Sequence, residues 1–404
     1  MTKRRNGEAS IFPYRNGYAA YAWVTTPDGE RKRKWVYGKT HEEVHAKWIR
    51  LQSVASERPV STNATILSRY MVYWLREVIK PNLAPKTYEK YETFTRLHIL
   101  PYLGSRRLDK IQVKDIRHWL NQLAQVCQCC RQGKDAAQPE AKRKCCAIGK
   151  CCHAVLSPRS RADARDTLRA ALACAVEDEV ITRNVAAIVK LPAPRRRKRQ
   201  WWSVEDARRF LESARRDGET LYAAFVLILV MGLRKGEVLG LTWNLIDFDA
   251  GELYISQQIQ RVGHELLRRE VKTETSEAPL PLIDLCAAAL KLRKEQQDAD
   301  RGRAGSSWQD TGLVFTTRHG TAIEPRNFTR SFDRCIVRAA VPRITVHGTR
   351  KTCGSLLAAL DVHPRVAMQI LRHSKIAVTM EIYTEIPSAA TRDALRRLGR
   401  WLGE

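Results

Sequence analysis

The sequence predicts a multidomain α+β protein with a small β-sheet and helix, then a helical domain, then a mainly helical domain with a small antiparallel sheet. Alternating apolar residues between turn signals begin near position 18, apolar residues at helical spacing begin at Leu67, and a continuous apolar run extends from Leu221 to Met231. A chain of 404 residues is long enough for two or three cores. We expect domains at 1–60, 61–194 and 201–404, with a basic linker at 195–200.

The charge of the chain indicates a polyanionic partner. The formal net charge is +27 and the isoelectric point is about 9.9. Together these values favour nucleic acid. No apolar segment approaches the roughly 20 residues that a membrane-spanning helix needs. The basic residues at the start of the chain precede no apolar core, so we expect no secretion signal and a cytoplasmic protein.

In the first domain, the stretch YAAYAWV alternates after the turn residues Asn16 and Gly17, and KWVYG follows a second turn. Thr40 and Glu43 form a capping box that begins a helix. Four basic residues of the second strand pair are candidates for contacts with phosphate groups: Arg31, Lys32, Arg33 and Lys34. A solvated basic strand is the alternative.

The second domain contains two apolar helical faces, one beginning at Leu67 and one at Ile116. Lys86, Thr87 and Lys90 are candidate phosphate contacts there, with a solvated helix as the alternative. The domain ends in a proline-flanked basic run, which we expect to cross the backbone of a bound duplex or else to be a solvated linker. This run comprises Arg195, Arg196, Arg197, Lys198 and Arg199.

A cysteine-rich insertion at 127–153 interrupts the helical domain. It contains seven of the eleven cysteines: Cys127, Cys129, Cys130, Cys145, Cys146, Cys151 and Cys152. Thiols with basic neighbours ionise readily and bind zinc, whereas disulfides are rare in the cytosol. The spacing does not fix four ligands, so a structural zinc site and a reduced loop without metal both stay open.

The C-terminal half of the chain carries a set of residues suited to phosphodiester chemistry: Arg234, Lys272, His347, Arg350, His373 and Tyr383, with Glu237 one turn after Arg234. Guanidinium groups bind phosphate oxygens in a bidentate manner, and a tyrosine hydroxyl placed in line can attack phosphorus. The tyrosine then stays attached, which conserves the bond energy for rejoining. Each residue taken alone has an ordinary structural interpretation, so the order of the set carries the argument.

These residues stand in the motifs GLRKGEVLGLTW, HGTRKT and LRHSKIAVTMEIYTEI, and the chain resembles the tyrosine recombinases of the phage integrase family, of the kind encoded by actinobacterial phages and integrative elements. The resemblance implies that Arg234 and Arg350 hold the scissile phosphate and that Tyr383 is the nucleophile. It further implies that Lys272 protonates the leaving 5′-oxygen, that His347 acts as a base, that His373 donates to the phosphate, and that Glu237 supports the site.

The resemblance also implies an arm-type DNA-binding domain at 1–60 and a SAM-like core-binding domain after it. The sequence departs from the family pattern at Arg372, where glycine is usual, and at Gly348 and Thr349, where aspartate and leucine are common.

The function implied is a site-specific recombinase that integrates or excises a phage or mobile element through a 3′-phosphotyrosyl intermediate. A type IB topoisomerase-like relaxation of DNA and a catalytically silent DNA-binding regulator are the alternatives. We expect the protein to bind attachment-site DNA as a homotetramer, together with accessory or directionality factors. We expect it to be associated with the nucleoid of a bacterial host. We expect no cofactor for catalysis, because Asp247 and Asp249 read as a turn and no Walker loop is present.

Overall fold

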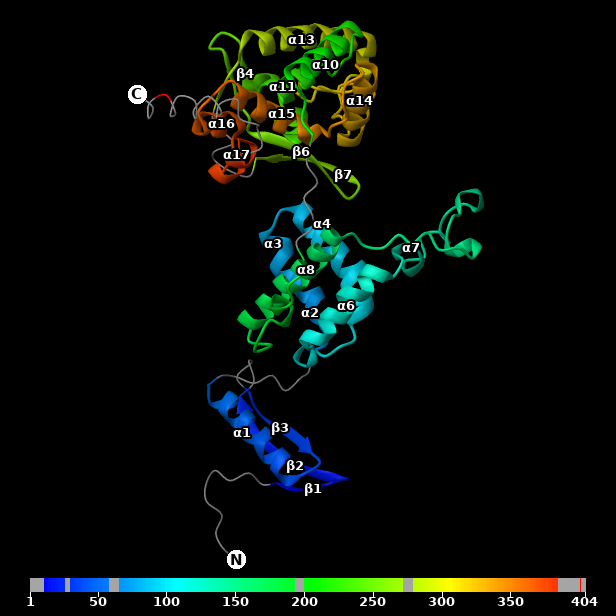
Figure 1. Ribbon diagram of the computed structural model, residues 1–404, viewed down its shortest axis with the longest axis vertical. Helices are drawn as coiled ribbons and strands as arrows, with labels where there is room; N and C mark the ends of the chain where they lie inside the picture. The colour runs from blue at the N-terminus through cyan, green and yellow to red at the C-terminus, as the bar shows by residue number, and fades with distance from the viewer. Residues whose placement is uncertain are drawn as a thin grey trace, which may run out of the picture. The chain divides into compact units, whose positions relative to one another are not determined.

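The computed structural model describes residues 11–25, 30–57, 65–192, 200–271, 279–383 and Arg400. The chain divides into two compact units, residues 1–195 and 196–404 (Figure 1). The division falls within the basic stretch at the end of the helical domain. The mixed α+β class expected from the sequence is confirmed, with small antiparallel sheets and a majority of helices.

The first unit begins with a three-stranded antiparallel sheet covered by one helix. The elements are β1 (Phe12–Tyr14), β2 (Gly17–Thr25), β3 (Arg31–Gly38) and α1 (His41–Glu57). Alternate residues of β2 face the helix, where Ala20, Ala22 and Val24 pack against Val44 and Trp48. The predicted helix start is confirmed, because the Thr40 hydroxyl accepts a hydrogen bond from the backbone N–H of Glu43.

The helical domain follows in the same unit around its own apolar core, in which Trp74 and Trp119 are the largest buried side chains. Two helices contain π-helical turns, and the indole of Trp119 donates to the carbonyl of His98 at 2.7 Å. The elements are α2 (Leu67–Tyr73), a π-helical segment (Trp74–Ile79), α3 (Lys80–Asn82), α4 (Pro85–Phe94), a second π-helical segment (Thr95–Ile99), α5 (Leu100–Leu103), a 3₁₀ turn (Leu108–Lys110), α6 (Val113–Gln125), α8 (Pro158–Glu177) and α9 (Val185–Ile188).

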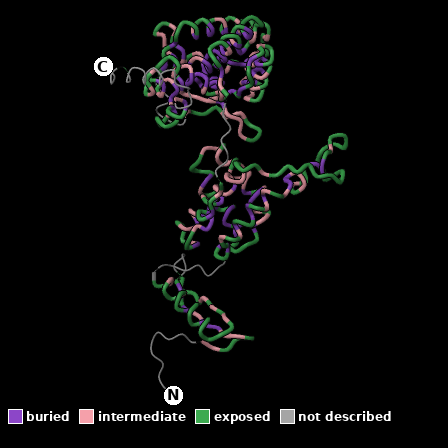
Figure 2. Tube along the Cα trace, in the orientation of Figure 1, coloured by how far each residue is buried: buried purple, intermediate pink, exposed green. Residues whose placement is uncertain are grey.

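The cysteine-rich insertion lies between α6 and α8. Its regular structure is limited to α7 (Gln128–Arg131) and two 3₁₀ turns, Glu140–Lys142 and Cys146–Ile148. Figure 2 shows this segment mostly exposed, in contrast to the helices that it interrupts. Neither Cys127 nor Cys145, its two buried cysteines, belongs to an apolar cluster.

The second unit is a helical domain built around α11, which packs against α10, α13 and α15. The helices are α10 (Val204–Arg216), α11 (Tyr222–Val230), α12 (Lys235–Gly240), α13 (Asp284–Ala304), α14 (Pro325–Arg338), α15 (Val346–Ala359), α16 (Pro364–Leu371) and α17 (Ile376–Tyr383), with 3₁₀ turns at Trp243–Leu245 and Gly305–Ser307. Nearly every residue of α11 is buried, as its uninterrupted apolar sequence predicts.

Two small sheets flank these helices. One has the order β4-β5-β8, and the other is the hairpin β6-β7, which packs on α12. The strands are β4 (Ile246–Asp247), β5 (Glu252–Leu253), β6 (Gln257–Val262), β7 (Glu265–Glu270) and β8 (Leu280–Pro281). The predicted turn at Asp247 is confirmed, because its carboxylate accepts the backbone N–H groups of Asp249 and Ala250. None of the helices within the described ranges has the length and apolar composition to cross a membrane.

Gly232 ends α11 and turns the chain toward Arg234. Its φ is +62°, and a Cβ atom placed there would lie 2.6 Å from the buried side chain of Leu371. Gly218, which follows α10, has a similar φ of +59° but no atom within 4 Å of such a Cβ. Both positions need the left-handed conformation that glycine adopts easily, but only Gly232 also lacks space for a side chain. Substitutions at the two positions can therefore distinguish the two effects.

We expect Gly218→Ala to destabilise the second unit by about 1–2 kcal/mol, the strain of a left-handed residue. Gly232→Ala should cost about 2–4 kcal/mol, because overpacking adds to the same strain. The thermal unfolding midpoints of the two variants of the full chain measure the difference. Equal midpoints would show that Leu371 moves aside freely and that packing at Gly232 is unimportant.

Candidate active site

Arg234 is held by the carboxylate of Glu237. Arg234 is not part of the buried helix α11: the chain turns at Gly232, and Arg234 is the extended residue just before α12. Glu237 accepts the backbone N–H of Arg234 at 2.8 Å and its Nη1 at 2.6 Å. The Glu237 side chain is 3 % exposed and that of Arg234 is 42 % exposed, so the guanidinium is anchored on one side and open on the other.

Arg350 is the buried cation of the site. It lies one turn after His347 on α15, a helix that begins after Thr345, whose hydroxyl accepts the N–H of Gly348. Arg350 is 4 % exposed, and its Nη1 donates to the carbonyl of Gly232 at 2.5 Å. Among the described residues, its buried Nη2 has no hydrogen-bond acceptor. A buried charged donor without an acceptor is costly, which indicates that an anion belongs beside it.

Burial and the neighbouring cations lower the pKa values of two residues of this site. Burial, followed by the charge of Arg234, lowers the pKa of Arg350 to about 9. Burial, followed by Arg350, Arg234 and His347, lowers the pKa of His373 to about 4. The His373 ring shares a hydrogen bond of 2.9 Å between its Nδ1 and the hydroxyl of Thr379. The local field is strongly positive, and the approach of an anion relieves it.

A cleft of about 480 Å³ opens beside these groups. The residues that line it are Leu233, Arg234, Lys235, Thr329, Asp333, Arg343, Ile344, Thr345, Val346, His347 and Arg350. Three of the predicted site residues therefore share one cleft with the first turn of α15, whose backbone dipole also favours an anion. The cleft combines guanidinium, imidazole and backbone donors around a space suited to a phosphodiester.

Arg372, the departure from the family pattern, proves to be part of this site. Its φ of +49° places it in the left-handed region, which explains why glycine is usual there. Its side chain is 1 % exposed and donates to Glu237 at 2.5 Å, while its carbonyl accepts from Arg234. The substitution was visible in the sequence, but its inward orientation was not.

Glu237 thus balances two arginines. Burial by itself raises the pKa of the Glu237 carboxyl, but Arg372, Arg234 and the N–H of Arg234 outweigh burial and hold the pKa below its ordinary value. The carboxylate is consequently the centre of an ion-pair network rather than a proton donor.

Tyr383 occupies a different environment from the cations. It is the last residue of α17 and packs against Cys353, Leu371 and Ile382. Its hydroxyl donates to the carbonyl of Val362 at 2.5 Å, and burial raises the pKa of its phenol. Arg234, His347 and Arg350 line the cleft, and His373, which is not in the lining, is close enough for all three to lower its pKa. Tyr383 is not in the lining either, and its hydroxyl is bonded to Val362.

Two of the predicted sets of residues lie outside the described residues. Lys272 belongs to the undescribed range 272–278, which begins after Val271 at the end of the β6-β7 hairpin. The linker residues Arg195, Arg196, Arg197, Lys198 and Arg199 belong to the range 193–199. Their predicted roles stay predictions.

The four basic residues of β3 lie on two different faces of the N-terminal sheet, because side chains alternate along the strand. Arg31 and Arg33 pair with Thr25 and Trp23 on the face opposite α1, where both guanidinium groups lie over the ring of Trp23. Lys32 and Lys34 pair with Val24 and Ala22 on the helix-covered face. The open face also carries exposed aromatic residues: Tyr14, Trp23, Trp35 and Tyr37. This mixture of arginine and aromatic groups fits nucleic acid.

The candidate contacts in the helical domain are engaged in ion pairs. Lys86 donates to Glu89 at 2.6 Å, and Lys90 donates to Asp163 at 2.8 Å. Thr87 lies in the first turn of α4, half-buried. A phosphate bound here has to compete with these carboxylates, which weakens the case for Lys86 and Lys90 relative to Arg31 and Arg33.

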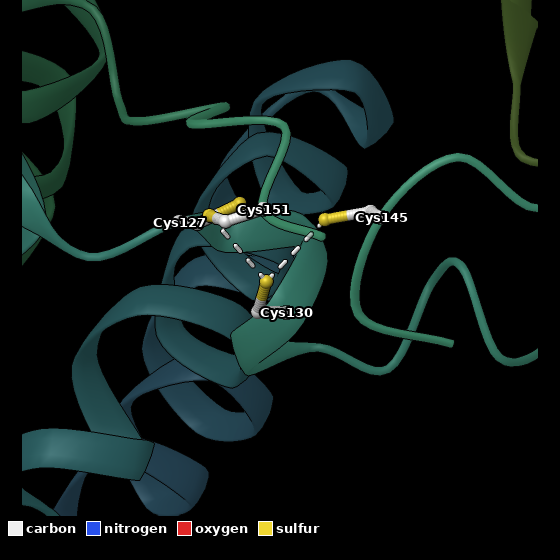
Figure 3. A group of neighbouring side chains, drawn as sticks. All are labelled: Cys127, Cys130, Cys145 and Cys151. Atoms are coloured by element: carbon white, nitrogen blue, oxygen red, sulfur yellow. Dashed lines mark hydrogen bonds between the residues drawn. The ribbon is translucent and has the colours of Figure 1, made fainter. Parts of the chain in front are cut away.

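The cysteines of the insertion converge on two overlapping groups. One contains Cys127, Cys130, Cys145 and Cys151 (Figure 3), and the other contains Cys129, Cys145 and Cys152. Within each group all sulfur atoms lie within 4.8 Å of one another. Cys146 belongs to neither group and is exposed. The arrangement is one that a metal ion can occupy.

The ion pairs of Glu237 with Arg234 and Arg372 predict how two substitutions of Arg372 change the stability of the chain. Both Arg372→Ala and Arg372→Gly remove a partner of the buried carboxylate, so both should be less stable than the parent chain at neutral pH. Arg372→Gly should be the more stable of the two by about 1–2 kcal/mol, because glycine relieves the left-handed strain. Calorimetry of the full chain measures this order.

The difference in stability between the parent chain and the Arg372 variants should also depend on pH. The depressed pKa of Glu237 contributes stability above the pKa of the unfolded chain, and that stability is lost as pH falls through the folded pKa. The gap between the parent chain and either variant should therefore narrow below about pH 4. A gap that stays constant from pH 7 to pH 3 would contradict the network.

Two family models match the chain. The model described as "Phage integrase family" matches residues 200–389, and the model described as "Phage integrase, N-terminal SAM-like domain" matches residues 66–124. A "Tyrosine recombinase XerC-like" protein of Caldanaerobacter subterraneus is 26 % identical over 95 % of this chain and 97 % of its own length. An "Integrase" of Saccharopolyspora erythraea is 22 % identical over 99 % and 98 %, respectively.

Solved structures share the fold. The Tn1549 transposon integrase in complex with transposon right end DNA superposes with a TM-score of 0.63 at 20 % identity, covering 84 % of this chain and all of that one. A lambda integrase tetramer bound to a Holliday junction gives a TM-score of 0.55 at 16 % identity, covering 96 % and 99 %. Since the two family models together span more than half of the sequence, this chain belongs to the phage integrase family of tyrosine recombinases.

Proposed function

We propose that this protein is a site-specific DNA recombinase that integrates or excises a phage or mobile element. The observation that carries the proposal is the guanidinium of Arg350, which is buried beside Arg234 in a cleft and has a donor without an acceptor in the described part of the chain. A DNA phosphate supplies the acceptor, and the two arginines hold its non-bridging oxygens.

The reaction begins when the Tyr383 oxygen attacks phosphorus. A bond forms between the tyrosine oxygen and phosphorus, the bond to the 5′-oxygen breaks, and the tyrosine proton passes to a base, for which His347 in the cleft wall is the candidate. Lys272 is the candidate proton donor to the 5′-oxygen. Attack by the 5′-hydroxyl of a partner strand reverses these steps and joins the new strand without an external energy source.

Tyr383 must first leave its present hydrogen bond. Its hydroxyl is bonded to the Val362 carbonyl, so α17 or its C-terminal end has to shift before the phenol reaches the cleft. We infer that DNA binding and assembly drive this movement. The related lambda integrase was solved as a tetramer bound to a Holliday junction, which supports a homotetramer on two duplexes.

Other partners follow from the same proposal. The open face of the N-terminal sheet, with Arg31 and Arg33, supports a contact to a separate DNA segment. Accessory or directionality factors, encoded by the host or by the element, are the expected additional partners. A substrate in the bacterial chromosome places the protein at the nucleoid, in the cytoplasm.

The nucleophile is tested with a nicked duplex that carries the site chosen by footprinting and traps a covalent adduct. Tyr383→Phe should abolish the adduct while leaving DNA binding nearly unchanged, because it removes one hydroxyl. Tyr254→Phe is the matched control, since Tyr254 is an exposed tyrosine of the same unit whose hydroxyl bonds Glu252. Adduct formation by Tyr383→Phe would show that another residue attacks.

The phosphate clamp is tested with the same substrate. Arg234→Ala should abolish the adduct, and Arg350→Lys, which retains the charge but loses the guanidinium fork, should slow adduct formation by roughly 10²–10³-fold. DNA affinity should change little in both variants. Adduct formation at the normal rate would exclude the clamp. An adduct that rejoins only its own strand would favour a topoisomerase, and no adduct from the parent chain would favour a silent regulator.

The titration of His373 reports on the anion in the cleft. NMR of histidine-labelled protein, assigned with His373→Gln, should show a His373 midpoint near pH 4 in the free protein. Addition of inorganic phosphate should raise this midpoint, since an anion offsets the charges of Arg350 and Arg234. The unfolded chain protonates at a higher pH, so this group destabilises the fold as pH falls from about 6.5 to about 4. An unchanged midpoint with saturating phosphate would contradict the site.

A further inference from the structure

The cysteine-rich insertion has almost no apolar core to hold its fold. Between residues 127 and 153 the buried residues are Cys127, Gln128, Asp135 and Cys145, and none belongs to an apolar cluster. A segment of this size cannot stabilise a defined conformation by hydrophobic burial alone, and structural metals are a common substitute. The backbone nevertheless has a definite arrangement, so another interaction has to supply its stability.

The thiols provide that interaction. Cys127 immediately precedes the short helix α7 and Cys130 lies within it, so the two form a C-x-x-C pair, while Cys145 and Cys151 come from a separate loop. Figure 3 shows the four side chains directed toward a common point. The sulfur of Cys130 lies 3.4 Å from that of Cys145 and 3.8 Å from that of Cys151. Four sulfurs at about 2.3 Å from a tetrahedral zinc ion lie ~3.8 Å apart.

Polar groups around the thiols hold them in place. The backbone N–H of Cys152 donates to the sulfur of Cys145 at 3.1 Å, and the N–H of His153 donates to that of Cys151 at 3.4 Å. Donors of this kind stabilise thiolates and orient them. The buried carboxylate of Asp135 accepts the N–H groups of Lys144, Cys145 and Ala147, which fixes the loop that carries Cys145.

The charge of the insertion suits a thiolate–zinc centre. Four thiolates with one divalent cation carry a net charge of −2. The segment 127–153 contains six lysine or arginine residues and two carboxylates, so its own charge offsets that of the centre. Sulfur separations of 3.4 Å and more are well beyond a disulfide bond of about 2.05 Å, so the thiols are placed as separate ligands.

We propose that Cys127, Cys130, Cys145 and Cys151 bind one structural Zn²⁺ ion that holds the insertion together. This set has priority over Cys129, Cys145 and Cys152 because it supplies all four ligands of a closed tetrahedral site, whereas the second group supplies three and shares Cys145. The site also fixes α7, whose Arg131 donates to the carbonyl of Pro101 and lies over the ring of Tyr102. The ion thereby anchors the base of the insertion to the helical domain.

The test uses the full chain without a histidine tag, purified under reducing conditions and without chelator. Metal analysis should give one zinc per chain, and exchange with Co²⁺ should give the absorption of a tetrahedral tetrathiolate site. Cys130→Ser and Cys151→Ser should lose the metal and become sensitive to proteases within residues 127–153. Cys146→Ser is the matched control, because Cys146 is adjacent to a proposed ligand but belongs to neither group, and it should keep the metal.

Three outcomes would overturn the proposal. One is a metal-free parent chain whose insertion resists proteases as well as that of the zinc-supplemented protein. Another is metal loss in Cys129→Ser and Cys152→Ser with retention in Cys130→Ser and Cys151→Ser, which would assign the ion to the second group. The third is a thiol titration that finds these cysteines paired as disulfides in the reduced preparation. None of these measurements involves DNA, so they are independent of the recombinase activity.

Discussion

The active-site region depends on a single buried carboxylate. Glu237 accepts from the guanidinium groups of Arg234 and Arg372 and from the backbone at the start of α12, so it fixes both the side chain and the main chain of the residue that faces the cleft. Without this carboxylate, the guanidinium groups of Arg234, Arg350 and Arg372 would repel one another in a region of low dielectric constant. The carboxylate compensates part of that charge and leaves enough of it uncompensated to attract a phosphate.

The sequence predicted the local elements of this arrangement well. The apolar run that forms α11 contains no charge, and a helix of that composition has to be buried. Arg234 and Glu237 lie three residues apart and were expected one helical turn apart, and His347 and Arg350 have the same spacing. That the two pairs lie close together in space was predicted only through the resemblance to a family. The contact between the turn at Gly232 and α15 joins distant parts of the chain, and no local sequence pattern predicts it.

The features that escaped prediction are long-range or conformational. In the sequence Arg372 is only a departure from the family pattern, but in the structure its side chain turns inward to a carboxylate 135 positions earlier. Arg31 and Arg33 lie on the opposite face of the sheet from Lys32 and Lys34. Because side chains alternate between the two faces of a strand, this separation could have been predicted from the sequence. The choice among seven cysteines needed the fold, because the loop that returns Cys145 to α7 is held by Asp135 rather than by any apolar pattern.

Under the proposed function, the hydrogen bond between Tyr383 and Val362 has a consequence for every duplex that the protein binds. An enzyme with its phenol permanently at the cleft would nick any duplex that its many positive charges attract. If Tyr383 is the nucleophile, as proposed, a single copy bound to DNA with its hydroxyl on a main-chain carbonyl would leave the strand intact. Strand breakage would then require an additional event that releases the phenol, so that selectivity would depend on a conformational threshold as well as on base recognition.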